Sequence, residues 1–324
     1  MVRGVTIVVI NQFPFPSDGK RYYTWNRYLR NEFGQKVYKV ALDAGFDCPN
    51  RDGTVAFGGC TFCSAAGSGD FAGNKVDPIA VQFKKIKAKM QHKWKDGLTM
   101  AYFQAYTNTH APLDILKEKF EAALACEGVM GISIATRPDC LPDDVVEYLA
   151  ELNERTYLWV ELGLQTVHEK TAHLINRAHD YATYVEGVEK LRRHNIRIVT
   201  HIINGLPLET YDMMMETARE VAKLDVQGIK IHLLHLLKGT PLVKQYEKGL
   251  LQLMEQDDYI QLVVNQLEVL PPNMIVHRIT GDGPIDLMVG PMWSVNKWSV
   301  LNGIDAELER RNTWQSKFYK VDEK

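Results

Sequence analysis

The stretch Cys48-Pro-Asn-Arg-Asp-Gly-Thr-Val-Ala-Phe-Gly-Gly-Cys60-Thr-Phe-Cys63 contains three of the five cysteines in the chain. It comes shortly after residues 36–42, Lys-Val-Tyr-Lys-Val-Ala-Leu, whose alternating and β-branched pattern predicts a strand. Glycine and proline are frequent between residues 49 and 73. We therefore expect a long loop whose backbone can come close to a bound group.

The three clustered thiols have no obvious fourth partner. A structural zinc site closes with four ligands, and the sequence has no histidine between Met1 and His92. An iron–sulfur cluster is held by thiolates, and three of them leave one iron with an open coordination position. The spacing therefore favours a catalytic cluster over the two alternatives, a zinc site and a disulfide.

The composition is that of an ordinary globular enzyme. Of 324 residues, 45% are hydrophobic and 24% are charged, and the formal net charge is −2. This balance excludes a strongly basic protein that coats nucleic acid, although a local basic patch is compatible with it. An odd number of cysteines, no signal peptide and no apolar run of membrane-spanning length predict a cytoplasmic protein.

The rest of the chain alternates between strand and helix patterns. Strands are expected at residues 36–42, 98–105, 128–135, 157–163, 196–203 and 228–235, and helices at 77–94, 112–125, 142–153, 167–175, 181–194, 209–223, 242–253 and 257–270. Six successive βα units predict an α/β fold with a parallel sheet, a partial (βα)6 TIM-type barrel over residues 36–270. Residues 1–35 form an N-terminal extension. Residues 271–324 form a C-terminal extension or lid, with one more strand and a helix at 299–311.

A three-cysteine loop after the first strand of such a barrel resembles the radical S-adenosylmethionine (SAM) superfamily. The long first gap and the segment Thr136-Arg-Pro-Asp139 resemble its subgroup related to the catalytic subunit of Elongator, the YhcC/YtqA type. The resemblance implies a 4Fe–4S cluster on Cys48, Cys60 and Cys63, whose unique iron binds SAM. It also implies reductive cleavage of SAM to a 5′-deoxyadenosyl radical.

The resemblance also implies which side chains contact SAM, because the loops after the strands form the active site of such barrels. The usual GGE-like segment is absent after the second strand, so residues there match by position only. A glutamine after the fourth strand lies near the ribose, an arginine in residues 176–180 pairs with the carboxylate, and a glycine turn at 205–210 meets the adenine. The SAM-binding residues expected are Gln104, Tyr106, Asn108, Thr136, Glu161, Gln165, Arg177, Gly205 and Leu206.

Three further residues are candidates for catalysis. Cys140 follows the third strand, next to the expected cavity. Lys230 and His232 lie on one face of the sixth strand, where either could donate a proton. A core role is the alternative for each of them. Arg137 and Asp139 could brace the cluster loop as an ion pair or bind substrate.

Two basic segments bear on the substrate. Lys84, Lys85, Lys87, Lys89, Lys93 and Lys95 share the polar side of one helix, and residues 20–30 interleave aromatic and basic side chains. A solvated helix face and aromatics packed on the barrel are the simpler interpretations. The subgroup resemblance favours tRNA, with a wobble-uridine side chain as target, and a low-potential electron donor such as flavodoxin or ferredoxin. The alternatives are radical chemistry on a small molecule, such as a porphyrin precursor, and a non-catalytic metal-binding RNA module.

Overall fold

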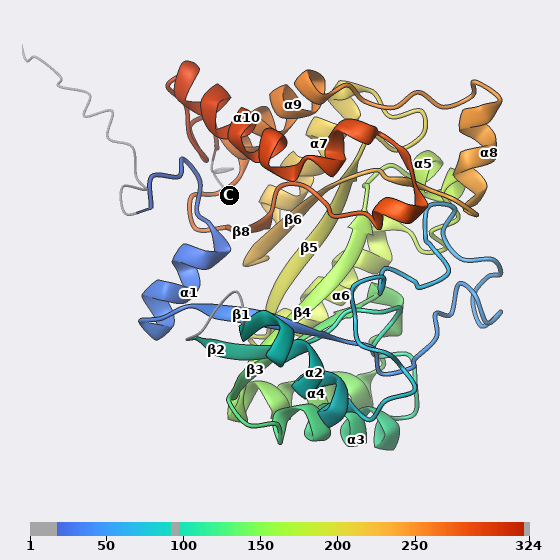
Figure 1. Ribbon diagram of the computed structural model, residues 1–324, viewed down its shortest axis with the longest axis vertical. Coiled ribbons are helices and arrows are strands. Elements are labelled where there is room, and N and C mark those ends of the chain that lie inside the picture. The colour runs from blue at the N-terminus through green and yellow to red at the C-terminus, as the bar shows by residue number, and fades with distance from the viewer. Residues whose placement is uncertain (1–17, 92–96, 321–324) are drawn as a thin grey trace, which may run out of the picture.

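The computed structural model describes residues 18–91 and 97–320. Its centre is a parallel sheet of seven strands in the order β1-β2-β3-β4-β5-β6-β8, and the outermost strands β1 and β8 do not pair with each other (Figure 1). This is the partial barrel that the sequence predicts. The strands are β1 Val37–Leu42, β2 Leu98–Phe103, β3 Val129–Thr136, β4 Tyr157–Gln165, β5 Arg197–Asn204, β6 Gly228–Leu233 and β8 Ile275–Arg278.

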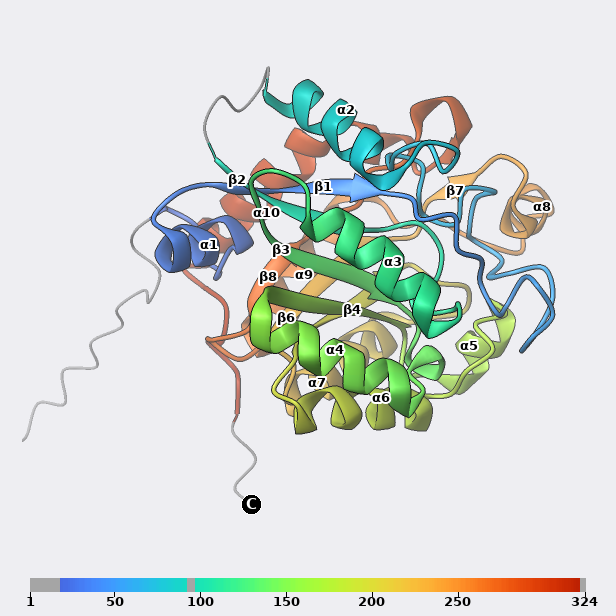
Figure 2. The ribbon, with the colours of Figure 1, turned by 90° about the horizontal axis from the view of Figure 1, so that it is seen from below.

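Helices cover the outer face of the sheet, where each hides an apolar stripe. In α7, for example, Met214, Ala218 and Val221 are buried at helical spacing. Figure 2 shows α3, α4, α6 and α7 along the same side of the strands. The helices are α1 Trp25–Phe33, α2 Ile79–Gln91, α3 Leu113–Leu124, α4 Asp143–Arg155, α5 Glu169–Leu174, α6 Tyr181–Arg193, α7 Tyr211–Lys223, α8 Pro241–Glu247, α9 Gln256–Val269 and α10 Lys297–Arg310.

Apolar side chains close the barrel at the amino ends of the strands. Met100, Trp159 and Val199 point inward from β2, β4 and β5 and form one buried cluster. Helix α1 adds Trp25, whose ring lies 3.9 Å from the His277 ring and 5.2 Å from the Trp159 ring. The aromatic side chains of the N-terminal extension therefore pack on the barrel, which supports the simpler of their two interpretations.

The tail differs from expectation in one respect. Its strand β8 pairs with β6 in parallel, so the sheet continues past residue 270 into the segment that the sequence assigns to an extension. The 3-10 turns Ile285–Leu287 and Met292–Val295 and the short antiparallel pair β7 Leu236–Leu237 and β9 Met288–Gly290 then lead to α10.

Helix α8 is also shorter than predicted. It ends at Glu247 because Gly249, with φ of +72°, adopts a left-handed conformation that ends the helical pattern. Of the helices that the structure describes, none has the length and apolar character needed to cross a membrane.

The lysine-rich helix α2 packs as its pattern predicts. Phe83 is buried in the core, whereas Lys84 and Lys89 are exposed. Lys85 pairs with Asp77 at 2.8 Å. Lys87 donates to the carbonyl of Glu127 at 2.7 Å. Lys93 and Lys95 lie outside the described residues.

Candidate active site

A cavity of about 990 Å³ lies at the carboxyl ends of the strands. Its walls come from the loop after β1, from the ends of β2 to β6, and from the segment after β8. Cys48, Cys60 and Cys63 all line it, and none forms a disulfide. The structure therefore brings the three clustered thiols to one wall of the space where β/α barrels place their chemistry.

The cysteine loop is held in a compact shape by hydrogen bonds. The backbone N–H of Cys63 donates to the Cys60 carbonyl at 3.0 Å. The side-chain amide of Asn176 donates to the carbonyls of Phe57 and Gly59 at 3.0 and 2.8 Å. The loop is thus tied to the segment after α5, which the sequence does not indicate.

The chemistry of the thiols fits an iron–sulfur cluster. A hydrogen bond from Cys63 lowers the pKa of Cys60 to about 7, and the charge of Arg137 acts in the same direction. The Asn50 amide also donates to the Cys60 sulfur at 3.5 Å. No three His, Cys, Asp or Glu side chains in the described ranges are placed to share one metal ion. The hydrogen bond with Cys60, together with burial, raises the pKa of Cys63 well above its usual value. Three clustered cysteines are instead, as thiolates, the donor set of a cluster with several irons.

Gln104 and Tyr106 line the cavity and support the cysteine loop. The Gln104 side-chain amide donates to the Ser68 carbonyl at 2.8 Å, and the Tyr106 hydroxyl donates to the carbonyl of Ala65. Gly67 has φ of +54°, and a Cβ at this position would collide with the Tyr106 ring. Only glycine therefore allows this close packing.

Asn108 does not reach the cavity. It is fully buried, and its side-chain amide donates to the carbonyls of Phe103, Ala105 and Ala135, at 3.2, 3.0 and 2.8 Å. Asn108 therefore ties the ends of β2 and β3 together. Thr136 and Gln165 do line the cavity, as the resemblance implies.

Arg177 is also absent from the cavity wall. Its guanidinium is buried and donates from Nη1 to the carbonyls of Leu164 and Thr166, at 2.6 and 2.5 Å, and from Nε to that of His179 at 2.9 Å. These hydrogen bonds hold the chain after β4, whereas Nη2 has no hydrogen-bond partner within the described residues. The arginines that line the cavity are Arg51, Arg137 and Arg278.

The ion pair between Arg137 and Asp139 is present. Nε and Nη2 of Arg137 donate to the two Asp139 oxygens at 2.9 and 2.7 Å, and Nη1 donates to the carbonyl of Arg177 at 2.8 Å. This fork geometry fixes the guanidinium beside the cysteine loop.

Gly205 and Leu206 lie behind the cavity wall. Gly205 has φ of +84°, and its N–H donates to the Met214 sulfur at 3.1 Å. Leu206 is 2% exposed and packs in an apolar cluster with Ile175 and Leu234. Leu234 lines the cavity, whereas Gly205, Leu206 and Ile175 do not.

Glu161 is the centre of a polar network inside the barrel. It is 1% exposed, and both Lys39 and Lys230 form ion pairs with it. His201 Nε2 donates to it at 2.7 Å, Tyr102 Oη at 3.1 Å and Ser133 Oγ at 2.8 Å. These six side chains come from β1 to β6, one from each strand, and all point to the barrel axis.

Burial alters the pKa values of the bases around this network. It lowers the pKa of Lys230 to about 7, although the Glu161 charge opposes the shift. It lowers the pKa of His201 to about 4 and that of His232 well below its usual value. Lys230 and His232 both line the cavity, so a lysine that can exchange its proton near neutral pH faces this space.

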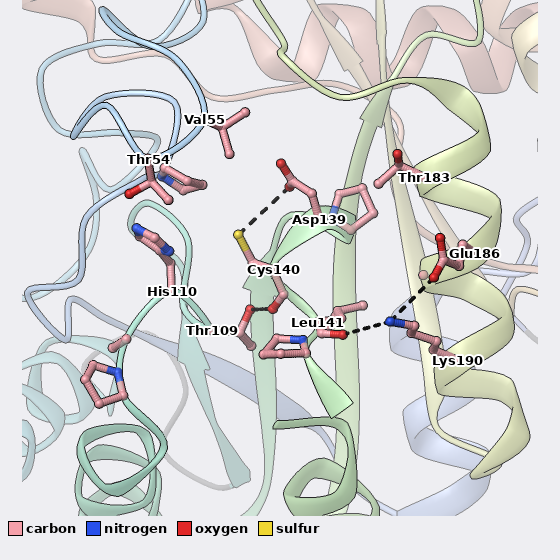
Figure 3. Close-up of a pocket in the computed structure, with 16 residues that line it drawn as sticks. Thr54, Val55, Thr109, His110, Asp139, Cys140, Leu141, Thr183, Glu186 and Lys190 are labelled. Carbon is pink, nitrogen blue, oxygen red and sulfur yellow. Dashed lines mark hydrogen bonds and ion pairs between the residues drawn. The ribbon is translucent and has the colours of Figure 1, made fainter. Parts of the chain in front are cut away.

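Cys140 lies in a second cavity of about 740 Å³, on the other side of the loop after β3 (Figure 3). Its sulfur points to Asp139, with Sγ 3.9 Å from Oδ1, while His110 and Lys190 stand on either side. Burial and the Asp139 charge raise the pKa of the Cys140 thiol. Cys140 is therefore not part of the wall of the main cavity, and its burial makes the thiolate form unfavourable.

Sequence reasoning missed several residues of the site. Lys39, Tyr102 and His201 are not among the residues predicted from the sequence, although each lies an even number of positions from an inward residue of its strand. Arg278 and Asp282, in and after β8, also line the cavity, in the segment that the sequence predicts to be an extension or lid. Strand alternation could have indicated the first three residues, whereas only the return of the tail to the sheet shows that Arg278 and Asp282 face the cavity.

Comparison with known protein families shows the superfamily to which the chain belongs. Residues 54–221 match the radical SAM superfamily, and residues 226–310 match the Radical_SAM C-terminal domain. The chain belongs to the radical SAM superfamily, and its cofactors are a 4Fe–4S cluster and SAM.

Individual relatives place the chain within this superfamily. Protein YtqA of Bacillus subtilis (strain 168) is 73% identical over 309 residues, which cover 95% of this chain and 96% of YtqA. Elongator complex protein 3 of Homo sapiens is 26% identical over 163 residues, 49% of this chain and 29% of that protein. The archaeal Methanocaldococcus infernus Elp3 shares the fold, with a TM-score of 0.65, 14% identity, and coverage of 86% of this chain and 64% of that one.

Proposed function

We propose that Cys48, Cys60 and Cys63 hold the 4Fe–4S cluster. When bound, this cluster supplies the electron that cleaves SAM to a 5′-deoxyadenosyl radical, which abstracts a hydrogen atom from the substrate. The convergence of the three thiols on one cavity wall supports this assignment.

We further propose that SAM lies against Gln104, Tyr106, Thr136 and Gln165, which line the same cavity. Glu161 also lines it, but five donors already occupy its oxygens. Gln104 and Tyr106 are themselves fixed by the cysteine loop, so this part of the wall is rigid. Arg137 contributes a fixed positive charge beside the loop. The chain excludes bulk water from the cavity floor by the apolar cluster below it.

The proposed substrate is tRNA, at the side chain of a wobble uridine. The observation that carries this proposal is the likeness to Elongator complex protein 3 over 163 residues. The cavity also suits a nucleotide that enters from a larger molecule. Phe71 and Ile285 line it and remain 54% and 66% exposed, and such apolar side chains can contact a base.

Lys230 and His232 are the proposed proton donors. Lys230 has a pKa of about 7 and faces the cavity, so it can donate or accept a proton at neutral pH. A flavodoxin or ferredoxin in the cytoplasm is the proposed source of the electron.

The test uses anaerobically reconstituted enzyme with SAM, a reductant and tRNA purified from cells that lack wobble-uridine modifications. We expect 5′-deoxyadenosine to form faster with this tRNA than without it, and a mass change in one uridine. The proposal is wrong if tRNA has no effect while a porphyrin precursor accelerates the reaction. Binding of zinc without iron or SAM would instead indicate a metal-binding RNA module.

A further inference from the structure

The Glu161 carboxylate has no acceptor capacity left for a ligand. Its two oxygens offer about four lone-pair positions. The structure places five donors on them, from the side chains Lys39, Tyr102, Ser133, His201 and Lys230. A ligand in the cavity therefore meets the cations around Glu161 more than the carboxylate itself.

The formal charges on this side of the cavity sum to a positive value. Glu161 is shared by two lysines, which leaves one positive charge in excess. Asp282 is likewise shared by Arg278, at 3.3 Å, and Lys297, at 2.7 Å, which leaves a second positive charge. Asp286, which also lines the cavity, offsets one of the two, so the net formal charge stays positive. Lys230 and Arg278 both line the cavity, so part of this excess faces the ligand directly.

Two histidines beside these cations have a ring nitrogen without a partner. Nε2 of His232 and Nε2 of His235 are buried and make no hydrogen bond within residues 18–91 and 97–320. Both side chains line the cavity. Because buried polar atoms are almost always satisfied in the functional state, these nitrogens indicate a bound group that carries hydrogen-bonding atoms.

The two ends of the cavity are formed by different strands and loops. The cysteine loop follows β1, whereas Lys230 and His232 belong to β6, Arg278 to β8, and His235 follows β6. The superfamily resemblance puts the methionine part of SAM, with its carboxylate, at the cysteine loop. The positive group on β6 and β8 is therefore available to a second ligand.

We propose that Lys230, His232, His235 and Arg278 form a subsite for an anionic group of the substrate, either a carboxylate or a phosphate. This inference rests on the proposed function only in taking that substrate to be a uridine of RNA. A carboxylate would belong to the uridine side chain, and a phosphate to the backbone. In either case the group anchors the substrate in the cavity.

The experiment measures dissociation constants by calorimetry on cluster-loaded enzyme with SAM and without reductant. The ligands are 5-carboxymethyluridine, its neutral amide 5-carbamoylmethyluridine, uridine 5′-monophosphate and uridine. We expect one anion to bind at least about tenfold more tightly than its neutral analogue, the scale of one charge-assisted hydrogen bond. The preferred anion identifies the source, side chain or backbone.

Variants locate the effect. Lys230→Met and Arg278→Gln should each remove most of the preference, and Arg278→Gln serves if loss of Lys230 prevents folding, since Arg278 is 35% exposed. Lys190→Gln is the matched control, because Lys190 lines the second cavity and not this one. The inference is overturned if charged and neutral ligands bind equally, or if both variants keep the full preference.

Equilibrium dialysis with radiolabelled acetate and phosphate separates this inference from the proposed function. If no uridine binds but one of these anions binds in a Lys230-dependent way, the subsite stands and the uridine assignment fails. If the enzyme modifies tRNA and shows no preference for any anion, the proposed function stands and the subsite is wrong.

Discussion

Glu161 and Lys230 form an ion pair in the middle of the barrel, although β5 separates their strands. The two side chains are 1% and 7% exposed. Burial alone would raise the pKa of Glu161, but the charges of Lys230 and Lys39 outweigh it and hold the pKa well below its usual range. Glu161 therefore stays ionised in a place where its charge alone would be costly, whereas burial lowers the pKa of Lys230 to about 7.

Replacement of Glu161 should destabilise the protein strongly. Glu161→Gln leaves two buried lysines without a counter-charge, and we expect a loss of about 3–5 kcal/mol in the free energy of unfolding, measured with urea. Glu121→Gln is the control, because Glu121 pairs with Arg155 where both side chains are nearly half exposed. Its loss should be below about 1 kcal/mol. Equal losses in the two variants would contradict this account of Glu161.

Acidification should weaken the fold through its buried histidines. Burial lowers the pKa of His235 to about 4 from an ordinary 6.5. Between these values the unfolded chain binds a proton that the folded chain does not, so stability falls as the pH decreases from about 6.5 to 4. In cluster-free protein, His235→Gln should lose about 2 kcal/mol less than the wild type between pH 7 and 5. Parallel losses would show that His235 does not contribute.

Arg177 gives a test between two roles. Its buried hydrogen bonds to three carbonyls predict that Arg177→Ala loses about 1–3 kcal/mol of stability, and that Arg177→Lys does not restore it. The superfamily resemblance instead implies a contact with the SAM carboxylate. Unchanged urea stability together with much weaker SAM binding, measured by calorimetry, would establish that contact and refute the scaffolding role.

The exposed lysines of α2 test the tRNA surface. Lys84→Gln with Lys89→Gln should weaken tRNA binding and reduce the slope of log affinity against log salt by roughly 0.7–0.9 for each phosphate that the variant no longer neutralises. Lys190→Gln with Arg193→Gln removes the same charge from α6 and should leave the slope unchanged. Identical slopes for wild type and the α2 variant would mean that this face is only solvated.

The sequence was most informative where structure depends on local pattern. The alternation at 36–42 and the glycine-rich cysteine loop each depend on neighbouring residues, and the strand and the cavity wall lie where they predict. Inward residues of the strands, such as Gln104, Glu161 and Lys230, also reach the cavity because strand parity fixes their side.

The misplaced residues lie in turns, where the direction of a side chain depends on distant partners. Arg177 turns inward to the carbonyls after β4, and Cys140 lies in the second cavity, between segments that contain His110 and Lys190. Neither placement leaves a local signal in the sequence. The pairing of Lys39 with Glu161 joins residues 122 positions apart, so only the assembled sheet reveals it.

The most direct test of the account is the iron content of single cysteine variants after anaerobic reconstitution. The wild type should bind about four irons per chain, whereas Cys48→Ala, Cys60→Ala and Cys63→Ala should each lose the cluster and with it reductive SAM cleavage. Cys126→Ala and Cys140→Ala should keep both, since neither residue lines the main cavity. A full complement of iron in any one of the first three variants would contradict the assignment of Cys48, Cys60 and Cys63 as the cluster ligands.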